Sequence, residues 1–147
     1  MHPTIKSWHQ LLSRRDTTGL ENLLADDAVF HSPIVHTPQR GKDVTALYLS
    51  AAFQVLINDS FHYVREVEGA NDAVLEFAVV IDGVQVNGVD MIRWNAEGKI
   101  TDFKVMVRPM KAMNKPMPAA MATWAMASEN TSPASEPVWL GNSGSCG

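Results

Sequence analysis

The chain has few of the features that cross-link a protein, insert it in a membrane or attract nucleic acid. Its one cysteine, Cys146, excludes an internal disulfide. No stretch reaches the roughly 18 apolar residues of a spanning helix, and the first residues lack the apolar core of a signal peptide. The net charge is −4, with both signs interspersed, which argues against nucleic acid or an anionic membrane surface as a partner. We therefore expect a cytoplasmic protein.

What is present is an ordinary globular composition, 46% hydrophobic over 147 residues, enough for one domain with a substantial core. Residues 1–127 are predicted to form this domain, with a methionine-rich extension from about residue 110. That extension could close a pocket or pack on a second subunit, but ordinary core packing is the simpler interpretation. Residues 128–147 are rich in Ser, Pro and Gly and are expected to form a flexible tail.

Three stretches carry apolar side chains at helical spacing. Their apolar positions are Ile5, Trp8 and Leu12; Leu20, Leu23 and Leu24; and Val44, Leu47, Ala51 and Val55. Thr18 and Glu21 have the Thr-x-x-Glu spacing of a capping box that would begin the second helix. A brief strand is predicted at 28–32, stopped by Pro33, and a polar loop at 34–40.

Four strand patterns follow the third helix, the first at 61–67 and the other three between 72 and 109. Short turns with glycine separate the last three, which predicts an antiparallel meander. The expected order is α-α-β-α-β-β-β-β, an α+β fold.

Asp90 lies in the middle of the third of these strands, among Val, Met and Ile. Two interpretations are open. Either the carboxyl pairs with Arg93 or a turn donor, or it occupies an apolar site, where lost hydration raises its pKa and makes it a proton donor.

Several phrases, at 23–33, 41–42, 88–94 and 98–100, resemble the NTF2-like superfamily, in particular its SnoaL-like and steroid delta-isomerase-like branch. The resemblance covers roughly residues 3 to 110. It implies a curved antiparallel sheet wrapped around helices, with a conical pocket. The superfamily includes isomerases, cyclases, dehydratases, epoxide hydrolases and proteins without catalysis, so function must be argued from the site.

The resemblance also implies site residues. In the steroid isomerases, an oxyanion-binding tyrosine, an aspartate base and a protonated aspartate carry the chemistry; these positions fall at Trp8, Ser32 and Asp90. A serine cannot replace a carboxylate base unless another group activates it. The side chains implied to contact the ligand are Trp8, Phe30, Leu75, Phe77, Val79, Gly88, Phe103, Val105 and Val107.

His31 and His36 flank Pro33 beside the expected mouth, so either is a candidate for the missing base; the alternative is that both are surface histidines. His9 and His62 have no acidic neighbour in the sequence. Gly88 predicts a bulge, a close ligand approach or an ordinary strand position. No metal site or cofactor is expected, because no pair of histidines has helical ligand spacing.

The opposite strand faces carry Glu76, Arg93, Lys104 and Arg108, which we interpret as an outer sheet surface that pairs two copies in a homodimer. The expected function is an apolar pocket for a small hydrophobic, carbonyl-bearing molecule. Asp90 would act as hydrogen-bond donor or general acid in an isomerase, cyclase or dehydratase. The alternatives are a non-catalytic ligand binder and a dimerisation module.

Overall fold

A computed structural model describes residues 1–114, so the predictions for the rest of the extension and for the tail lie outside the described residues. The elements in chain order are α1 (Pro3–Arg14), α2 (Leu20–Leu23), β1 (Leu24–His31), β2 (Gln39–Arg40), α3 (Lys42–Leu56), β3 (His62–Glu68), β4 (Asp72–Ile81), β5 (Val84–Trp94), β6 (Ile100–Arg108) and α4 (Met110–Asn114). The α+β fold and the order of the eight predicted elements are confirmed. The short β2, within the predicted loop, and α4 are additions.

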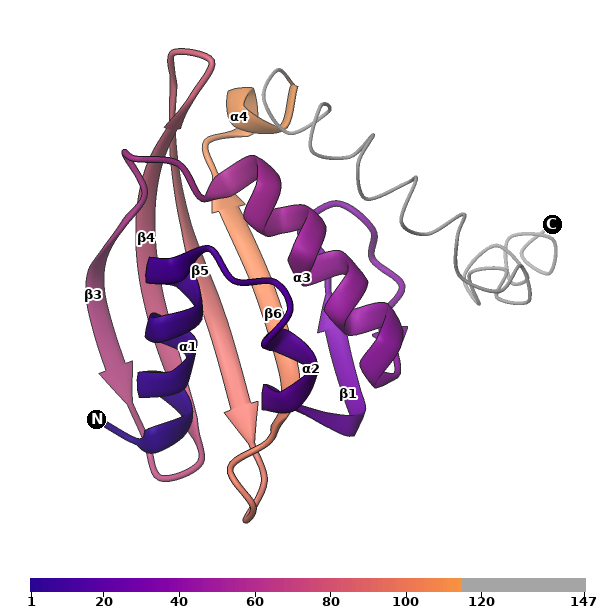
Figure 1. Cartoon of the computed structure of the whole chain (residues 1–147). Helices are drawn as coiled ribbons and strands as arrows, with labels where there is room; N and C mark the ends of the chain where they lie inside the picture. The colour runs from indigo at the N-terminus through magenta and orange to yellow at the C-terminus, as the bar shows by residue number, and fades with distance from the viewer. Residues whose placement is uncertain (115–147) are drawn as a thin grey trace, which may run out of the picture.

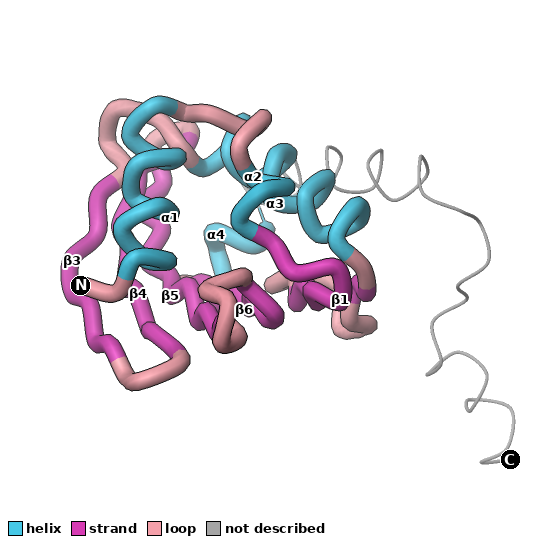
Figure 2. Tube along the Cα trace, turned by 60° about the horizontal axis from the view of Figure 1, so that its bottom comes forward, coloured by secondary structure: helices cyan, strands magenta, loops and turns pink. Residues whose placement is uncertain are grey.

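All described strands form one curved, six-stranded sheet in the order β2-β1-β6-β5-β4-β3. Strands β3 to β6 form the predicted antiparallel meander, and β1 pairs with β6 in parallel. Helices α1, α2 and α3 lie over one face of this sheet (Figure 1), and the β3–β4 end curls up beside α1 (Figure 2). The sheet therefore has a covered concave face and an open outer face.

Helix α1 forms as predicted, with Ile5, Trp8 and Leu12 on its buried face. The His2 side chain accepts a hydrogen bond from the backbone N–H of Thr4, and Pro3 occupies the first turn, where a missing N–H is tolerated. The capping box for α2 is wrong. Thr18 directs its N–H and hydroxyl to Asp16 instead, and Gly19 begins the helix without a side-chain cap.

The buried face of α3 is broader than the sequence pattern indicated. Of the predicted positions, Ala51 is buried, whereas Val44, Leu47 and Val55 are half-buried. The buried side chains of α3 are Thr45, Ala46, Tyr48, Leu49, Ala51, Ala52, Phe53 and Leu56. The helix packs against both β1 and α2, so it buries two adjoining faces rather than one stripe.

Alternation along β4, β5 and β6 sends one set of side chains into the core and the other outward. Asp82 and Gly83, both with positive φ, form the tight turn between β4 and β5. The bulge considered at Gly88 is wrong, because Gly88 pairs regularly with Phe77 and Val107. A Cβ at Gly88 would lie 2.3 Å from the Phe77 ring, so the glycine makes room for that ring rather than for a ligand.

Candidate functional site

Two hydrogen bonds connect Trp8, Tyr63 and Asp90 across the concave side of the sheet. The indole Nε1 of Trp8 donates to the Tyr63 hydroxyl at 2.8 Å, and that hydroxyl donates to Asp90 Oδ2 at 2.6 Å. The three side chains come from α1, β3 and β5. The Trp8 Nε1, the Tyr63 hydroxyl and Asp90 Oδ2 are thereby paired, as buried polar groups require.

Asp90 has the apolar surroundings that make a carboxyl a proton donor. It is 6% exposed and lies between Leu75 of β4 and Val105 of β6. Burial raises the pKa of Asp90 to about 7, although the hydrogen bond from Tyr63 opposes that rise. Burial and the nearby carboxylate also raise the pKa of Tyr63 well above its usual value, so Tyr63 remains a phenol. Near neutral pH, therefore, a neutral carboxylic acid is available beside a neutral phenol.

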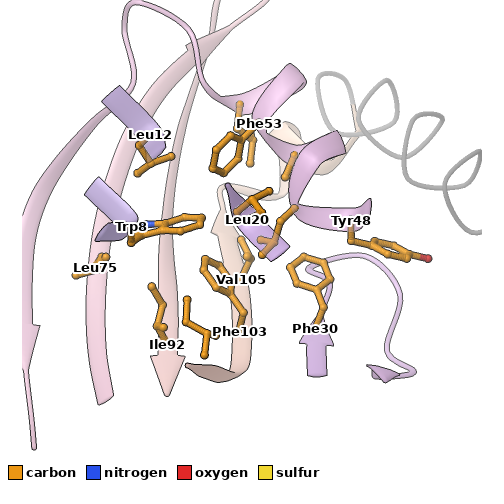
Figure 3. Packing of buried hydrophobic residues seen from close by; sticks show 14 of the residues in the cluster. Trp8, Leu12, Leu20, Phe30, Tyr48, Phe53, Leu75, Ile92, Phe103 and Val105 are labelled. Carbon is orange, nitrogen blue, oxygen red and sulfur yellow. The ribbon is translucent and has the colours of Figure 1, made fainter. Parts of the chain in front are cut away.

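Asp90 lines a small cavity of about 30 Å³. The other lining residues are Trp8, Leu12, Leu49, Ala52, Phe53, Leu56, Ile57, Phe61, Phe77, Phe103 and Val105. The Trp8 ring lies between Phe53 and Phe103 (Figure 3), with ring centroids 5.4 and 4.9 Å away. This space is large enough for one water molecule and too small for a metabolite unless lining side chains move.

Apart from Ser32, the positions implied by the resemblance divide into three groups. Five of them line the cavity, namely Trp8, Phe77, Asp90, Phe103 and Val105. Four are buried in the core around it: Phe30, Leu75, Val79 and Gly88. Val107 is half-buried against that core. The Trp8 N–H is engaged by Tyr63, so it is not free to meet a ligand as the resemblance implied.

The candidate bases in the first strand and its loop do not line this cavity. The Ser32 hydroxyl accepts hydrogen bonds from the N–H groups of Ile34 and Val35, at 3.1 and 3.3 Å. His31 pairs through Nε2 with Asp102 at 2.9 Å and, by alternation with buried Phe30, lies on the outer face. His36 is exposed. The structure thus brings Trp8 and Asp90 together and leaves Ser32, His31 and His36 apart from them.

Tyr63 was missed by the sequence analysis. Its strand has mostly polar and exposed residues, so the apolar pattern gave no reason to place a side chain in the site. The signal available was a tyrosine, one of two in the chain, in a polar strand: a buried tyrosine usually needs a partner for its hydroxyl. Its partner, Asp90, is 27 residues away and could not be identified from spacing.

Within residues 1–114, no group of three or more His, Cys, Asp or Glu side chains could hold a metal ion. None of the helices in this part of the chain is long and apolar enough to cross a membrane.

Comparisons with known proteins place this geometry in a family. The SnoaL-like domain model matches residues 5–103. A steroid delta-isomerase from Pseudomonas aeruginosa has 39% sequence identity and a TM-score of 0.74, over 84% of this chain and 92% of that one.

A second solved structure, from Silicibacter pomeroyi, is described as an uncharacterized protein with a cystatin-like fold; it is 33% identical, with a TM-score of 0.76, over 83% of this chain and 85% of its own. An NTF2-like protein from Mesorhizobium loti, 17% identical with a TM-score of 0.63 over 72% and 88% of the two chains, shares the fold. No protein in the curated set matches the chain. The chain belongs to the SnoaL-like domain family and has the NTF2-like fold.

Proposed function

We propose that this protein binds a small hydrophobic molecule with a carbonyl group and that protonated Asp90 donates a hydrogen bond to the carbonyl oxygen. The observation that carries the proposal is the carboxyl in the cavity wall, with Oδ2 bonded by Tyr63. This bond leaves Oδ1 to carry the proton toward a ligand. The steroid delta-isomerase relative favours an isomerase, and cyclisation or dehydration through an enol would use the same donor.

A neutral acid at this position favours enolate chemistry. When a proton leaves the carbon next to a carbonyl, negative charge develops on the carbonyl oxygen, and a hydrogen bond already aimed at that oxygen stabilises it. The apolar walls strengthen this interaction because water does not compete for it. Tyr63 holds the carboxyl in place while its own hydroxyl receives the Trp8 N–H.

Ligand entry requires the cavity to open. Ile57, which follows α3, and Phe61, which precedes β3, are half-buried and line the cavity. They adjoin the short segment 58–60 between α3 and β3, whose side chains are less buried than the core. We expect this segment to move when a ligand binds, with the strands that position Asp90 unchanged.

The test compares Asp90→Asn with Asp102→Asn, the same chemical change on the outer face. Binding of β,γ-unsaturated ketones of increasing size, from cyclohex-3-enone to a Δ5-3-ketosteroid, is followed by tryptophan fluorescence. Isomerisation is followed by the absorbance of the conjugated enone. Asp90→Asn should weaken binding or reduce turnover while Asp102→Asn behaves as wild type. Equal behaviour of the two variants would contradict the proposal.

Asp90→Asn should also keep its circular dichroism spectrum. An unfolded Asp90→Asn variant beside a folded Asp102→Asn variant would make Asp90 structural and would contradict the assignment.

A dimerisation role has its own support, on the outer sheet face. Apolar side chains exposed there include Val67, Val74, Met91 and Met106, by 60%, 37%, 36% and 49%. Arg65 and Glu76 pair at 3.2 Å among them, so this face carries both charge signs and can complement a second copy of itself. We propose a homodimer through this face.

The dimer proposal is tested by sedimentation of the wild type and of Val74→Glu, which should shift the protein toward monomer. Gln85→Glu, an exposed position of the adjoining strand near the β4–β5 turn, is the matched control. A monomeric wild type would contradict the homodimer without affecting the ligand site.

A further inference from the structure

A surface hollow of about 390 Å³ adjoins the small cavity. Its lining residues are His9, Leu12, Ser13, Arg15, Ile57, Asn58, Asp59, Phe61, His62 and Tyr63. Leu12, Ile57 and Phe61 line both spaces, so these three side chains separate the hollow from Asp90. The hollow has the size of ordinary small-molecule sites, roughly 300–1,000 Å³, which the cavity lacks.

Tyr63 takes part in both the hollow and the cavity. Its ring lines the hollow, while its hydroxyl donates to Asp90 in the cavity. A ligand that displaced Phe61 and placed its carbonyl oxygen at Asp90 would therefore extend along Tyr63 into the hollow. The ligand atoms next to its carbonyl would then lie where the cavity and the hollow adjoin, near the side chain that packs against Tyr63 there.

That group is His9. Its ring meets the Tyr63 ring edge-on, at 5.3 Å between centroids and 89° between planes. Its Nε2 is buried and lies against the Glu66 carboxylate without forming a hydrogen bond to it. The side chains of His9 and Glu66 are 29% and 33% exposed. A neutral imidazole with its proton on Nε2, toward the carboxylate, leaves Nδ1 as the nitrogen that can accept a proton from a ligand.

A β-bulge produces this arrangement. The pairing of β3 with β4 shifts between Tyr63 and Arg65, so Val64 is the extra residue. Without the shift, Tyr63 and Glu66 would point to opposite faces of the sheet; with it, Tyr63 pairs with Phe77 and Glu66 with Leu75, both inward-facing residues. Bulges often re-aim side chains beside functional sites, and this one brings Glu66 to the face that α1 covers.

The other polar groups of the hollow are less suited to reach the ligand. Arg15 and Asp59 pair with each other at 2.7 Å, and both are exposed. His62 is exposed and bonds the Ser60 carbonyl through Nδ1 at 2.9 Å. Ser13 is exposed and has no base among its hydrogen-bond partners in the described residues. His9 is therefore the titratable side chain that stands against Tyr63.

We propose that the hollow is the entrance and outer half of the ligand site, and that His9, oriented by Glu66, is the base of the reaction at Asp90. This inference rests on the proposed function. It replaces Ser32, His31 and His36, which the structure separates from Asp90.

The proposed reaction conserves its protons. A carbon–hydrogen bond next to the carbonyl breaks, its proton goes to Nδ1 of His9, and its electron pair forms the enolate, whose oxygen accepts the hydrogen bond from Asp90. In an isomerisation, His9 then returns the proton to the far carbon of the dienolate. No oxidant, reductant or co-reactant is needed, and His9 and Asp90 end in their starting states.

The test measures exchange of the ketone's α-hydrogens in D2O by NMR, alongside ligand binding by fluorescence. His9→Gln should lower the exchange rate about 10²- to 10⁴-fold, the usual contribution of a general base, and leave binding largely intact. Glu66→Gln should lower exchange less. Gln10→Ala, an exposed position on the same helix, is the control and should match wild type. Added imidazole should partly restore exchange in His9→Ala.

The outcomes separate this inference from the one before it. Unchanged exchange in His9→Gln, or loss in His31→Gln instead, overturns His9 as the base. A wild type that binds ketones without exchanging them also overturns it and leaves the Asp90 binding site in place. Binding and turnover that are both unaltered in Asp90→Asn overturn both proposals. If His9→Gln does not fold, Glu66→Gln decides the question, and exchange equal to wild type overturns the pair.

Discussion

The two faces of the sheet give the same residue types different environments. Aspartates and histidines on the two faces differ in exposure and in their partners. Asp90 faces the helices, is 6% exposed and accepts from a phenol. Asp102, one strand away on the other face, is 36% exposed in its side chain and pairs with His31. Burial raises the pKa of Asp90 to about 7, whereas Asp102 keeps a solvent-accessible partner. The environment, not the residue type, makes one carboxyl a candidate acid.

Two histidines on opposite sides of the sheet also lie beside carboxylates. His9 and His31 each have a carboxylate beside them, Glu66 and Asp102. His9 lines a hollow that adjoins the cavity, while His31 lies on the outer face of the sheet. A carboxylate–imidazole pair can act as a base only where a substrate can reach it, so position separates two similar pairs.

The largest effect should come from the core under α1. Trp8→Ala removes a ring that is 2% exposed and packs on Phe53 and Phe103, and it leaves the Tyr63 hydroxyl without a donor. We expect a loss of about 3–5 kcal/mol in the free energy of unfolding, measured by urea denaturation. Gln10→Ala, at an exposed position of the same helix, is the control and should change it by about 0.5 kcal/mol or less. Similar losses in both variants would mean that the loss at Trp8 does not come from its buried ring.

The second prediction concerns pH. The pKa of Asp90 is raised from 3.8 to about 7, so the folded state holds a proton that the unfolded state releases between these values. The contribution of Asp90 to the free energy of unfolding should therefore be largest near and below about pH 4. It should fall as pH rises toward 7, by up to roughly 4 kcal/mol. Unfolding measured across this range should show the slope in wild type and Asp102→Asn but not in Asp90→Asn. A slope retained in Asp90→Asn would assign it to another group.

Tyr63→Phe should have an intermediate effect. It removes the hydrogen bond that lowers the pKa of Asp90 and leaves the Trp8 N–H without its acceptor. We expect a loss of about 1–3 kcal/mol and a pKa of Asp90 above that in wild type, measured by carbon-13 NMR of the carboxyl. Tyr48→Phe, in α3, is the comparison and should leave the Asp90 titration where it is. A lower Asp90 pKa in Tyr63→Phe would contradict the hydrogen bond.

Gly88→Ala should have an effect of the same size or smaller. The added Cβ would lie 2.3 Å from the Phe77 ring and 2.7 Å from the Met106 carbonyl oxygen, so β5 or the ring must shift. Such overpacking costs about 1–3 kcal/mol and should lower the melting temperature. Gly83→Ala is not a suitable control because its φ is +77°; Ala78→Gly, half-buried on the neighbouring strand, tests the opposite change. An unchanged melting temperature would show that Phe77 repacks freely.

Much of the fold follows from local pattern. The spacing of Ile5, Trp8 and Leu12 predicted α1, and the Asp82-Gly83 turn predicted the β4–β5 hairpin, because each depends on neighbours in sequence. Asp90 was recognised as a candidate site residue for the same reason. A single acid in an apolar, alternating strand must either pair with a charged or polar group or lie in an apolar site. Patterns failed where the ends of elements depend on distant packing, as at Thr18 and along α3.

The site needed more than pattern. Tyr63 and Asp90 are in contact although 27 residues separate them in the sequence. His9 and Glu66 are in contact although 57 residues separate them. No spacing rule connects such residues. The bulge at Val64 is also invisible in a strand whose side chains are mostly polar on both faces, since register is weakly specified there.

The fold class and the strand meander could be predicted from the sequence, because hydrophobic periodicity encodes which face of each element is buried. For Asp90 the sequence left two settings open, and the tertiary structure was needed to place its carboxyl in the apolar interior. The same holds for the partners: Tyr63 for Asp90, Glu66 for His9 and Asp102 for His31. Partnership depends on how β3 is registered against β4 and how α1 lies over both, and these are set by long-range packing that no local stretch contains.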